Sequence, residues 1–261
     1  MADDLILIDE PAPYVRRVTL NRPEKRNAIS NALRSEFLAA LQAADTDEAV
    51  RVSIVRGSGT CFSSGYDLKS DLGADQPYFT ADVGTQFSRH IAEGFLSVWD
   101  LAKPVIAQVH GYAMAGGLEL ASSCDLVYIA DDAKLSHPVV KFAGLPDFAP
   151  FPFLALMRNA MELHLTGRQF TAQEAVSMGL ANRAFPAEEL DERVLEIAVE
   201  IAQTNAAVLS VNKRYVHAAM EAMGARSVIR TAPDLQAGAK LDAARGDIGN
   251  LTERVKASSK A

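Results

Sequence analysis

Two short glycine-containing segments constrain the fold of this chain more than any other feature. They read CFSSGYDL (61–68) and AMAGGLELA (113–121), and each follows an apolar run typical of a buried β-strand. Each also leads toward a helix, so unpaired backbone N–H groups are expected at the helix start, where they favour negative charge. Strands that alternate with helices in this way predict an α/β core.

The order of the expected elements supports that fold class. Paired strands at 5–9 and 14–20 flank a proline turn, and a helix at 32–44 follows Ser30 as its N-cap. Further strands are expected at 50–57, 103–111, 124–130 and 133–138, and helices at 171–179, 187–203 and 206–223. We predict an α/β core over 1–200 and a helical region over 201–261, with a mobile loop at 70–85.

Composition excludes several classes of protein. Of 261 residues, 49% are hydrophobic and 23% charged, which suits one large core, and the net charge of -7 without a basic block argues against a nucleic-acid surface. Cys61 and Cys124 are too few for a disulfide framework, which indicates a reducing compartment. The N-terminus is acidic, and no stretch approaches the roughly 20 apolar residues that span a bilayer. We therefore expect a cytoplasmic protein that contacts no membrane.

Glu119 adds a possible catalytic group to the second segment. It follows Gly116 by three residues, so on a helix both residues lie on one face. One interpretation is that Glu119 only complements the helix dipole. Its apolar neighbours Met114, Leu118 and Leu120 favour a carboxylate that exchanges a proton near neutral pH.

Three segments together carry a family resemblance. LNRPEKRNAIS (20–30), CFSSGYDL and KPVIAQVHGYAMAGGLELASSCDLVYIA (103–130) closely resemble the enoyl-CoA hydratase/isomerase, or crotonase, family, and the correspondence runs from about residue 5 to about residue 215. The resemblance implies a crotonase-like spiral of ββα units with a C-terminal helical trimerisation region, assembled as a homotrimer or a dimer of trimers. It also implies that the amides of Tyr66 and Gly116 form an oxyanion hole for a thioester.

The resemblance further implies which residues bind the substrate, an acyl-CoA thioester. The implied contacts to CoA and the acyl group are Lys25, Arg26, Ala28, Ser64, Asp67, Leu68, Gly117, Pro138 and Val139. Because CoA belongs to the substrate, we expect no separate cofactor and no metal ion.

The chain departs from the family pattern at one catalytic position. Hydratases of this family use two glutamates, of which Glu119 matches the first, but the second position is occupied by Val139. Asp147 is the candidate replacement, since similar relatives, including dienoyl-CoA isomerases and an aryl-CoA dehalogenase, use an aspartate there as a base or nucleophile. Asp147 is equally compatible with capping the following helix. His137 is expected to form a structural hydrogen bond more readily than to act in the site.

These observations leave several functions open. Hydration of an enoyl-CoA is the leading expectation. The alternatives are isomerisation of an enoyl- or dienoyl-CoA and hydrolysis (ring-opening or of a β-keto acyl-CoA), each using Glu119 and Asp147. A non-catalytic acyl-CoA-binding protein is the alternative of another class. A nucleotide-binding domain is disfavoured because the chain lacks GxxxxGK[ST] and a matching GxGxxG.

Overall fold

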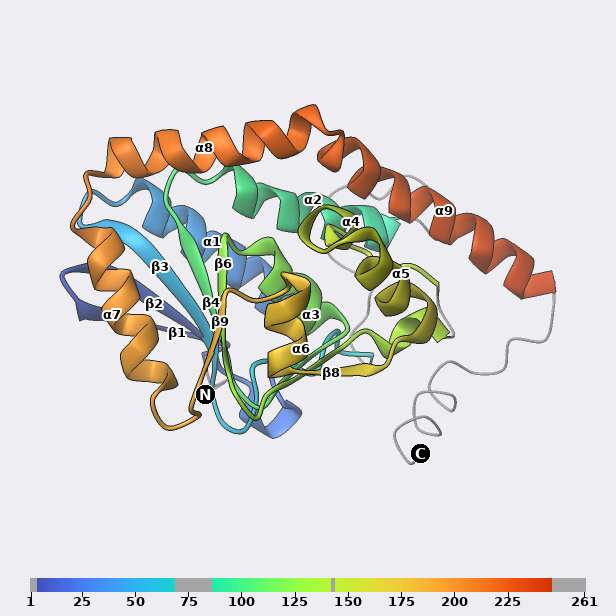
Figure 1. Ribbon diagram of the computed structural model, residues 1–261, viewed down its shortest axis with the longest axis horizontal. Coiled ribbons are helices and arrows are strands. Elements are labelled where there is room, and N and C mark those ends of the chain that lie inside the picture. Colours follow the sequence, from blue (N-terminus) through green and yellow to red (C-terminus); the bar gives the residue numbers. More distant parts are fainter. Residues whose placement is uncertain (1–3, 69–85, 142–143, 246–261) are drawn as a thin grey trace.

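The computed structural model describes residues 4–68, 86–141 and 144–245, with the backbone alone at 86–88 and 237–245, and the predicted loop at 70–85 lies outside them. Two sheets form the β-structure (Figure 1). The larger has the order β1-β2-β3-β4-β6-β9 and is parallel except for the antiparallel pair β1 and β2. Its strands are β1 Ile6–Ala12, β2 Tyr14–Leu20, β3 Val50–Gly57, β4 Val105–Val109, β6 Leu126–Ala130 and β9 Arg183–Phe185. The smaller contains β5 Tyr112–Met114, β7 Lys134–Ser136 and β8 Gln169–Thr171.

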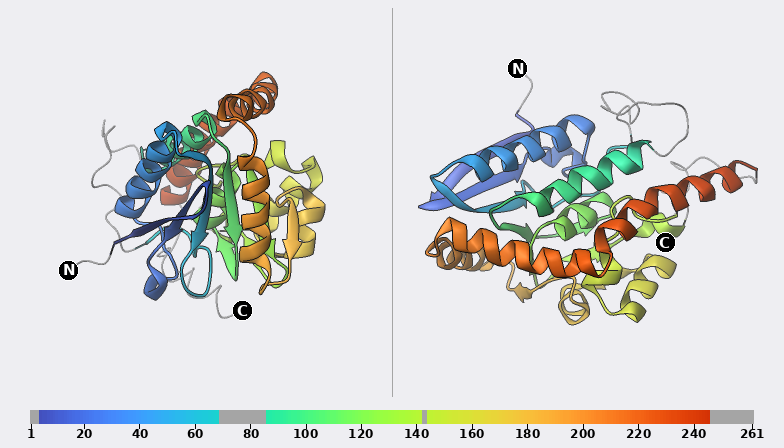
Figure 2. Two further views of the ribbon diagram at one scale, coloured as in Figure 1. Left: turned by 90° about the vertical axis from the view of Figure 1, so that its left-hand side faces the viewer. Right: turned by 90° about the horizontal axis from the view of Figure 1, so that it is seen from above.

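Helices cover both faces of the large sheet, so the mixed α/β class is confirmed. The α-helices are α1 Asn31–Thr46, α2 Gln86–Asp100, α3 Gly116–Ser123, α4 Phe151–Leu154, α5 Met157–Thr166, α6 Ala172–Met178, α7 Leu190–Ala202, α8 Ala206–Ala222 and α9 Ala225–Arg245. Two 3₁₀ turns are η1 Pro23–Lys25 and η2 Pro138–Lys141. Figure 2 shows α1 and α7 on opposite sides of the sheet, and both helices contact β2 and β3.

Local sequence signals account for several element boundaries. The Ser30 side chain accepts the N–H of Leu33 and begins α1, as predicted. Thr171 forms a capping box with Glu174 at the start of α6, and Gly179 ends that helix at a φ of 83°. The first strand is longer than expected and runs through Pro11, because a register shift between Asp9 and Ala12 accommodates a residue that lacks an N–H.

The C-terminal helices do not all lie outside the core. The views from the front and from above show α8 crossing one end of the sheet layer and α9 continuing onward from it, and α9 contacts α2 (Figures 1 and 2). Ala225, Ile229 and Ala232 of α9 are buried in the same hydrophobic core as the strands. Within the described ranges no single helix is long and apolar enough to cross a membrane; only α7 and α8 together, bent by 105°, meet that length and composition. The division of the chain at residue 200 remains a prediction.

Candidate active site

The two glycine-containing segments run side by side and approach most closely at Gly65 and Gly116. This close approach is called the crossing below. Ser63 pairs with Ala113 in a parallel bridge, and the N–H of Met114 donates to the carbonyl of Ser63 at 3.0 Å. Gly65 has a φ of +97°, and a Cβ at this position would lie 3.2 Å from the nitrogen of Gly116. Glycine at 65 is therefore required by both conformation and close approach. Because the Tyr66 amide directly follows Gly65, the two backbone amides singled out from the sequence lie at one crossing.

The aromatic ring of Tyr66 packs directly on Gly116. A Cβ at position 116 would lie 2.6–2.8 Å from three atoms of that ring, so a side chain at this position would displace it. Ala115, which precedes the helix, holds a φ of 48°. Left-handed backbone of this kind is strained for a residue with a Cβ and tends to occur at functional sites. The turn directs the first residues of α3 into the interior.

The Glu119 carboxylate lies below this crossing and is almost completely buried, with 1% of the residue exposed. Four groups donate to it. The hydroxyl of Tyr66 lies 2.5 Å from Oε2 and Nε2 of His137 lies 2.7 Å from Oε1. The backbone N–H groups of Asp147 and Phe148 donate to Oε1 and Oε2 at 3.3 Å and 2.9 Å. An ionised carboxylate has about four acceptor positions, so those of Glu119 are occupied.

This arrangement links three distant parts of the chain. The hydrogen bonds bring together the loop after β3, the residue after β7 and the segment before α4. Burial, followed by the charge of Glu119, raises the pKa of Tyr66 well above its usual value, so the hydroxyl stays protonated and remains a donor. The physical role that this structure shows for Glu119 is to bind and orient its four donors.

His137 lies beside Glu119 and forms the kind of structural hydrogen bond that the sequence analysis favoured for it. It is 1% exposed, and because an ionised Glu119 only accepts, its proton is assigned to Nε2. Among the described residues, Nδ1 has no hydrogen-bond partner. The contact joins residues far apart in sequence, and the only local signal was the position of His137 next to Pro138.

Asp147 is 8% exposed and does not cap the following helix. The N-cap of α4 is Pro150, with no side-chain capping bond, so that alternative interpretation is wrong. Arg34 of α1, which the sequence analysis missed, is 2% exposed. Burial lowers the pKa of its guanidinium, while the charge of Asp147 acts to raise it. A cation, two acidic side chains and an imidazole thus share one buried region.

The segment with the expected CoA contacts lies against the first glycine-containing segment. The N–H of Ser64 donates to the carbonyl of Arg26 at 3.0 Å, and Ile29 pairs with Tyr66 in a parallel bridge. Asp67 forms an ion pair with Arg22 at 3.0 Å. Asp67, one of the residues predicted to contact CoA, therefore also holds Arg22 in place.

The remaining predicted contact residues differ in their exposure. Lys25, Arg26 and Leu68 are exposed, and those half-buried are Ala28, Ser64, Asp67, Pro138 and Val139. Gly117 is required by close packing, since a Cβ there would lie 2.6 Å from the carbonyl oxygen of Ser63. The sequence analysis missed Asn27, which is fully buried; its amide donates to the carbonyls of Ser58 and Cys61 at 2.8 Å and 2.9 Å. Asn27 thereby fixes the loop at 22–30 to the loop that follows β3.

We also searched the described residues for a metal site and for a pocket. No group of three or more His, Cys, Asp or Glu side chains there could hold a metal ion. A pocket of about 790 Å³ lies at the ends of β2, β3 and β4 beside the start of α7, and its lining includes Arg17, Arg56, His110 and Asp191. Neither Glu119 nor Asp147 lines that pocket, so it is separate from the crossing.

Comparison with known families agrees with this geometry. The enoyl-CoA hydratase/isomerase family matches residues 12–238, which include the crossing, Glu119 and Asp147. The chain belongs to the enoyl-CoA hydratase/isomerase family. It is accordingly an enzyme of that family.

Several members illustrate the similarity. A probable enoyl-CoA hydratase of Mycobacterium tuberculosis is 35% identical over 210 residues, 78% of each chain. A mitochondrial enoyl-CoA hydratase of Pongo abelii is 32% identical over 78% of this chain and 69% of its own length. The crystal structure of a probable enoyl-CoA hydratase from Mycobacterium smegmatis has a TM-score of 0.84 at 31% identity, covering 93% of this chain and 97% of that one. A monofunctional enoyl-CoA isomerase from the same organism has a TM-score of 0.69 at 29% identity, covering 83% and 94%.

Proposed function

We propose that this enzyme acts on acyl-CoA thioesters by stabilising an enolate, and that its reaction is the hydration of an enoyl-CoA. The observation that carries the proposal is the crossing of Gly65 and Gly116, which brings two backbone amides together above a buried polar cluster. A thioester oxygen between the amides of Tyr66 and Gly116 would accept from both as negative charge develops on it. Preorganised donors of this kind contribute about 10²–10³ in rate each.

The route of the proton differs from a two-glutamate mechanism. Val139 offers no acid or base at the second position, and the four acceptor positions of Glu119 are occupied by donors. We therefore assign the proton transfer to Asp147, which is buried beside Tyr66 and Arg34. Glu119 would hold the 147–148 backbone in place and would exchange a proton only if Tyr66 or His137 first released it.

Isomerisation is the second candidate, and Val139 favours it. Hydration requires a bound water, which a valine does not hold, whereas isomerisation requires only one base that moves a proton between two carbons. Asp147 would remove a proton next to the conjugated system, the two amides would hold the dienolate, and the protonated Asp147 would return the proton at another carbon. The relatives include proteins named for each of these two reactions.

CoA binding is proposed for the loop at 22–30 and the segment at 64–68. Lys25 and Arg26 are exposed and provide positive charge for the CoA phosphates. The N–H groups of Ala28 and Ser64 donate to the carbonyls of Lys25 and Arg26, and Asp67 and Leu68 follow Ser64 in the proposed CoA-binding segment. Gly117, Pro138 and Val139 are assigned to the acyl group. The proposed chemistry requires no cofactor or metal ion beyond the CoA of the substrate.

A panel of CoA thioesters tests the reaction. The protein is incubated with saturated, 2-enoyl, 3-enoyl, dienoyl and β-keto acyl esters, and the products are examined by mass spectrometry. Hydration adds the mass of one water, isomerisation leaves the mass unchanged but alters the retention time, and hydrolysis releases free CoA. Saturable binding without turnover of any ester would instead indicate a binding protein.

Two carboxylate variants test the assignment of the proton. Asp147→Asn should lower turnover by about 10²–10⁴ because it removes the acid/base group. Glu119→Gln should reduce both turnover and the thermal midpoint, since an amide cannot accept from four donors and leaves buried groups unpaired, at about 1–3 kcal/mol. Asp131→Asn, at an exposed turn residue, is the matched control. A Glu119→Gln protein of unchanged stability but with turnover reduced as strongly would return the proton transfer to Glu119.

A further inference from the structure

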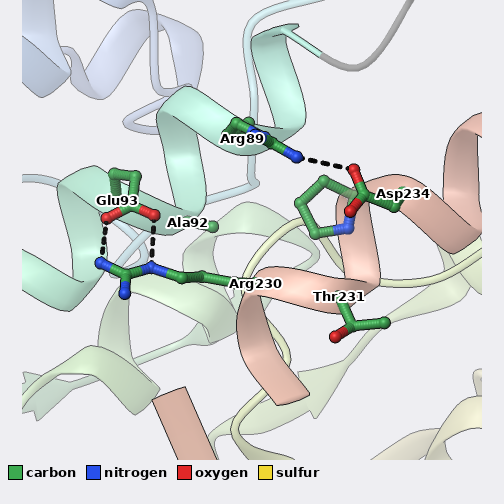
Figure 3. A pocket seen from close by; sticks show the side chains of 7 residues that line it. Arg89, Ala92, Glu93, Arg230, Thr231 and Asp234 are labelled. Carbon is green, nitrogen blue, oxygen red and sulfur yellow. Dashed lines mark hydrogen bonds and ion pairs between the residues drawn. The ribbon is translucent and has the colours of Figure 1, made fainter. Parts of the chain in front are cut away.

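The last described helix is fixed to α2 by a row of ion pairs. The pairs between α2 and α9 are Arg226 with Asp100 at 2.7 Å, Arg230 with Glu93 at 2.7 Å and Arg89 with Asp234 at 2.8 Å. Figure 3 shows the last two beside a small pocket of about 230 Å³ between the helices, with the Arg230 guanidinium bound to both oxygens of Glu93. These exposed pairs line up along the contact between α9 and α2 and add modestly to the burial of the apolar face of α9.

The opposite face of α9 points into the core and reaches the site. Ile229 and Ala232 are buried there, and Gln236 follows at a spacing that keeps it on the same face. Gln236 is 5% exposed. In the amide orientation that its neighbours require, its nitrogen donates to Oδ1 of Asp147 at 3.0 Å and to the carbonyl of Leu145 at 3.1 Å. One side chain thus ties both the carboxylate and the backbone of the segment at 144–150.

We propose that Gln236 is a positioning residue for Asp147, so that α9 completes the active site from the C-terminal side. The inference rests on the proposed function of Asp147 as the group that moves the proton. One N–H of the amide binds the carboxylate while the other holds the amide on the carbonyl of Leu145, which restricts the direction of the carboxylate. Misplacement of a catalytic group by about 1 Å can cost 10²-fold in rate. Phe148, next in the chain, packs edge-on against Phe95 and Trp99, which keeps this segment on α2 as well.

The charges around Asp147 determine what the loss of this contact should do. Arg34 from α1 opposes the negative charge of Asp147, whereas Glu119 from α3 adds to it. Tyr66 is kept protonated, and His137 is hydrogen-bonded to Glu119. Burial, followed by the charge of Arg34, lowers the pKa of His90 on α2. The amide of Gln236 adds one donor that favours the ionised form of Asp147. Removing it should move the acid limb of the pH–rate profile to higher pH.

Kinetics of two variants test the proposal in the full-length protein. Gln236→Leu removes both hydrogen bonds without adding charge, and Gln236→Glu replaces the amide by a carboxyl group that repels the Asp147 carboxylate or shares its proton. With but-2-enoyl-CoA, or the ester that the panel identifies, both should lower kcat about tenfold or more with little change in KM. The acid limb should move to higher pH in both variants. Thr231→Val is the matched control, because its hydroxyl bonds only the carbonyl of Ser227 in its own helix.

A double-mutant cycle supplies a readout that does not depend on turnover. Thermal midpoints are compared for Asp147→Asn, Gln236→Leu and the double variant; a direct contact predicts that the double variant loses less than the sum of the two single losses. Additive losses, or wild-type kcat and pH profile in both Gln236 variants while Asp147→Asn is inactive, would overturn the role of Gln236. Full activity of Asp147→Asn would instead reject the proposed function of Asp147, whatever the cycle shows for the contact.

Discussion

At the scale of single residues, the site is built around one carboxylate that binds four donors. Glu119 is the residue that a motif comparison singles out for proton transfer, yet the structure shows its oxygens occupied by Tyr66, His137 and two backbone amides. Buried polar networks of this kind are costly when one member is removed. Gly116 is important for the same network, because its missing side chain leaves room for the Tyr66 ring.

Gly116→Ala and Tyr66→Phe should therefore have unequal effects. The added methyl group would collide with the Tyr66 ring and disturb both the proposed oxyanion amides and the donor to Glu119, so turnover should fall by about 10² or more. Tyr66→Phe retains the ring and both amides and loses one donor, so turnover should fall by less than about tenfold while stability falls by about 1–3 kcal/mol. Steady-state kinetics and urea unfolding measure the two effects. Equal losses of turnover would contradict a role for the amides.

At the scale of elements, the docking of α8 depends on a buried ion pair. Lys213 of α8 lies 2.9 Å from Asp125, the residue before β6, and also donates to the carbonyls of Val98 and Lys103. His217, one turn along the helix, contacts the same carboxylate at 2.9 Å. The group ties α8 to the ends of α2 and β6, and α9, which carries Gln236, follows directly from α8.

Lys213→Met should destabilise the protein strongly. The variant leaves the half-buried Asp125 carboxylate without its buried cation and two carbonyls without their donor, although His217 and the Val105 N–H still bind Asp125. Breaking a buried pair from one side costs about 3–5 kcal/mol, and a loss at the lower end is expected here. Arg214→Met, at the next and exposed position of the same helix, should change stability by no more than about 0.5 kcal/mol. Urea unfolding followed by circular dichroism gives both values. Similar midpoints for the two variants would show that the pair contributes little.

The ends of helices were predicted best from the sequence. Ser30, Thr171 and Gly179 mark helix ends through local hydrogen bonds or φ preferences, and such signals need only a few neighbouring residues. The crossing of the two glycine-containing segments followed from the motifs at 61–68 and 113–121. Arg34 and Gln236 could not be found in this way. Each is a polar residue at an ordinary helical position, and it reaches the site only because of long-range packing.

At the scale of the whole molecule, two helix faces expose large apolar side chains. On and just before α5 the exposed residues include Leu156, Met157 and Leu165, and on α8 they include Val211 and Tyr215, which is 77% exposed. Exposed apolar groups in clusters of this kind commonly mark a protein interface. The proposed homotrimer or dimer of trimers would cover such faces.

The assembly is measured by size-exclusion chromatography with light scattering. We expect a mass of three or six chains, and Tyr215→Glu should shift the mass toward the single chain by placing a charge in the interface. Glu188→Gln, at an exposed position outside both faces, should leave the mass unchanged. A single-chain mass for the unaltered protein at all concentrations would reject the proposed assembly.

The hydrogen bonds from Gln236 to the segment at 144–150 have a consequence for how the enzyme is made. During synthesis the strands, the glycine crossing and the donors to Glu119 leave the ribosome well before Gln236 does. A nascent chain can therefore bury its sheet while Asp147 still lacks the amide that orients it. Premature termination between Asp147 and Gln236 would yield a product with the motifs by which the family is identified but without the contact proposed to make them fully active.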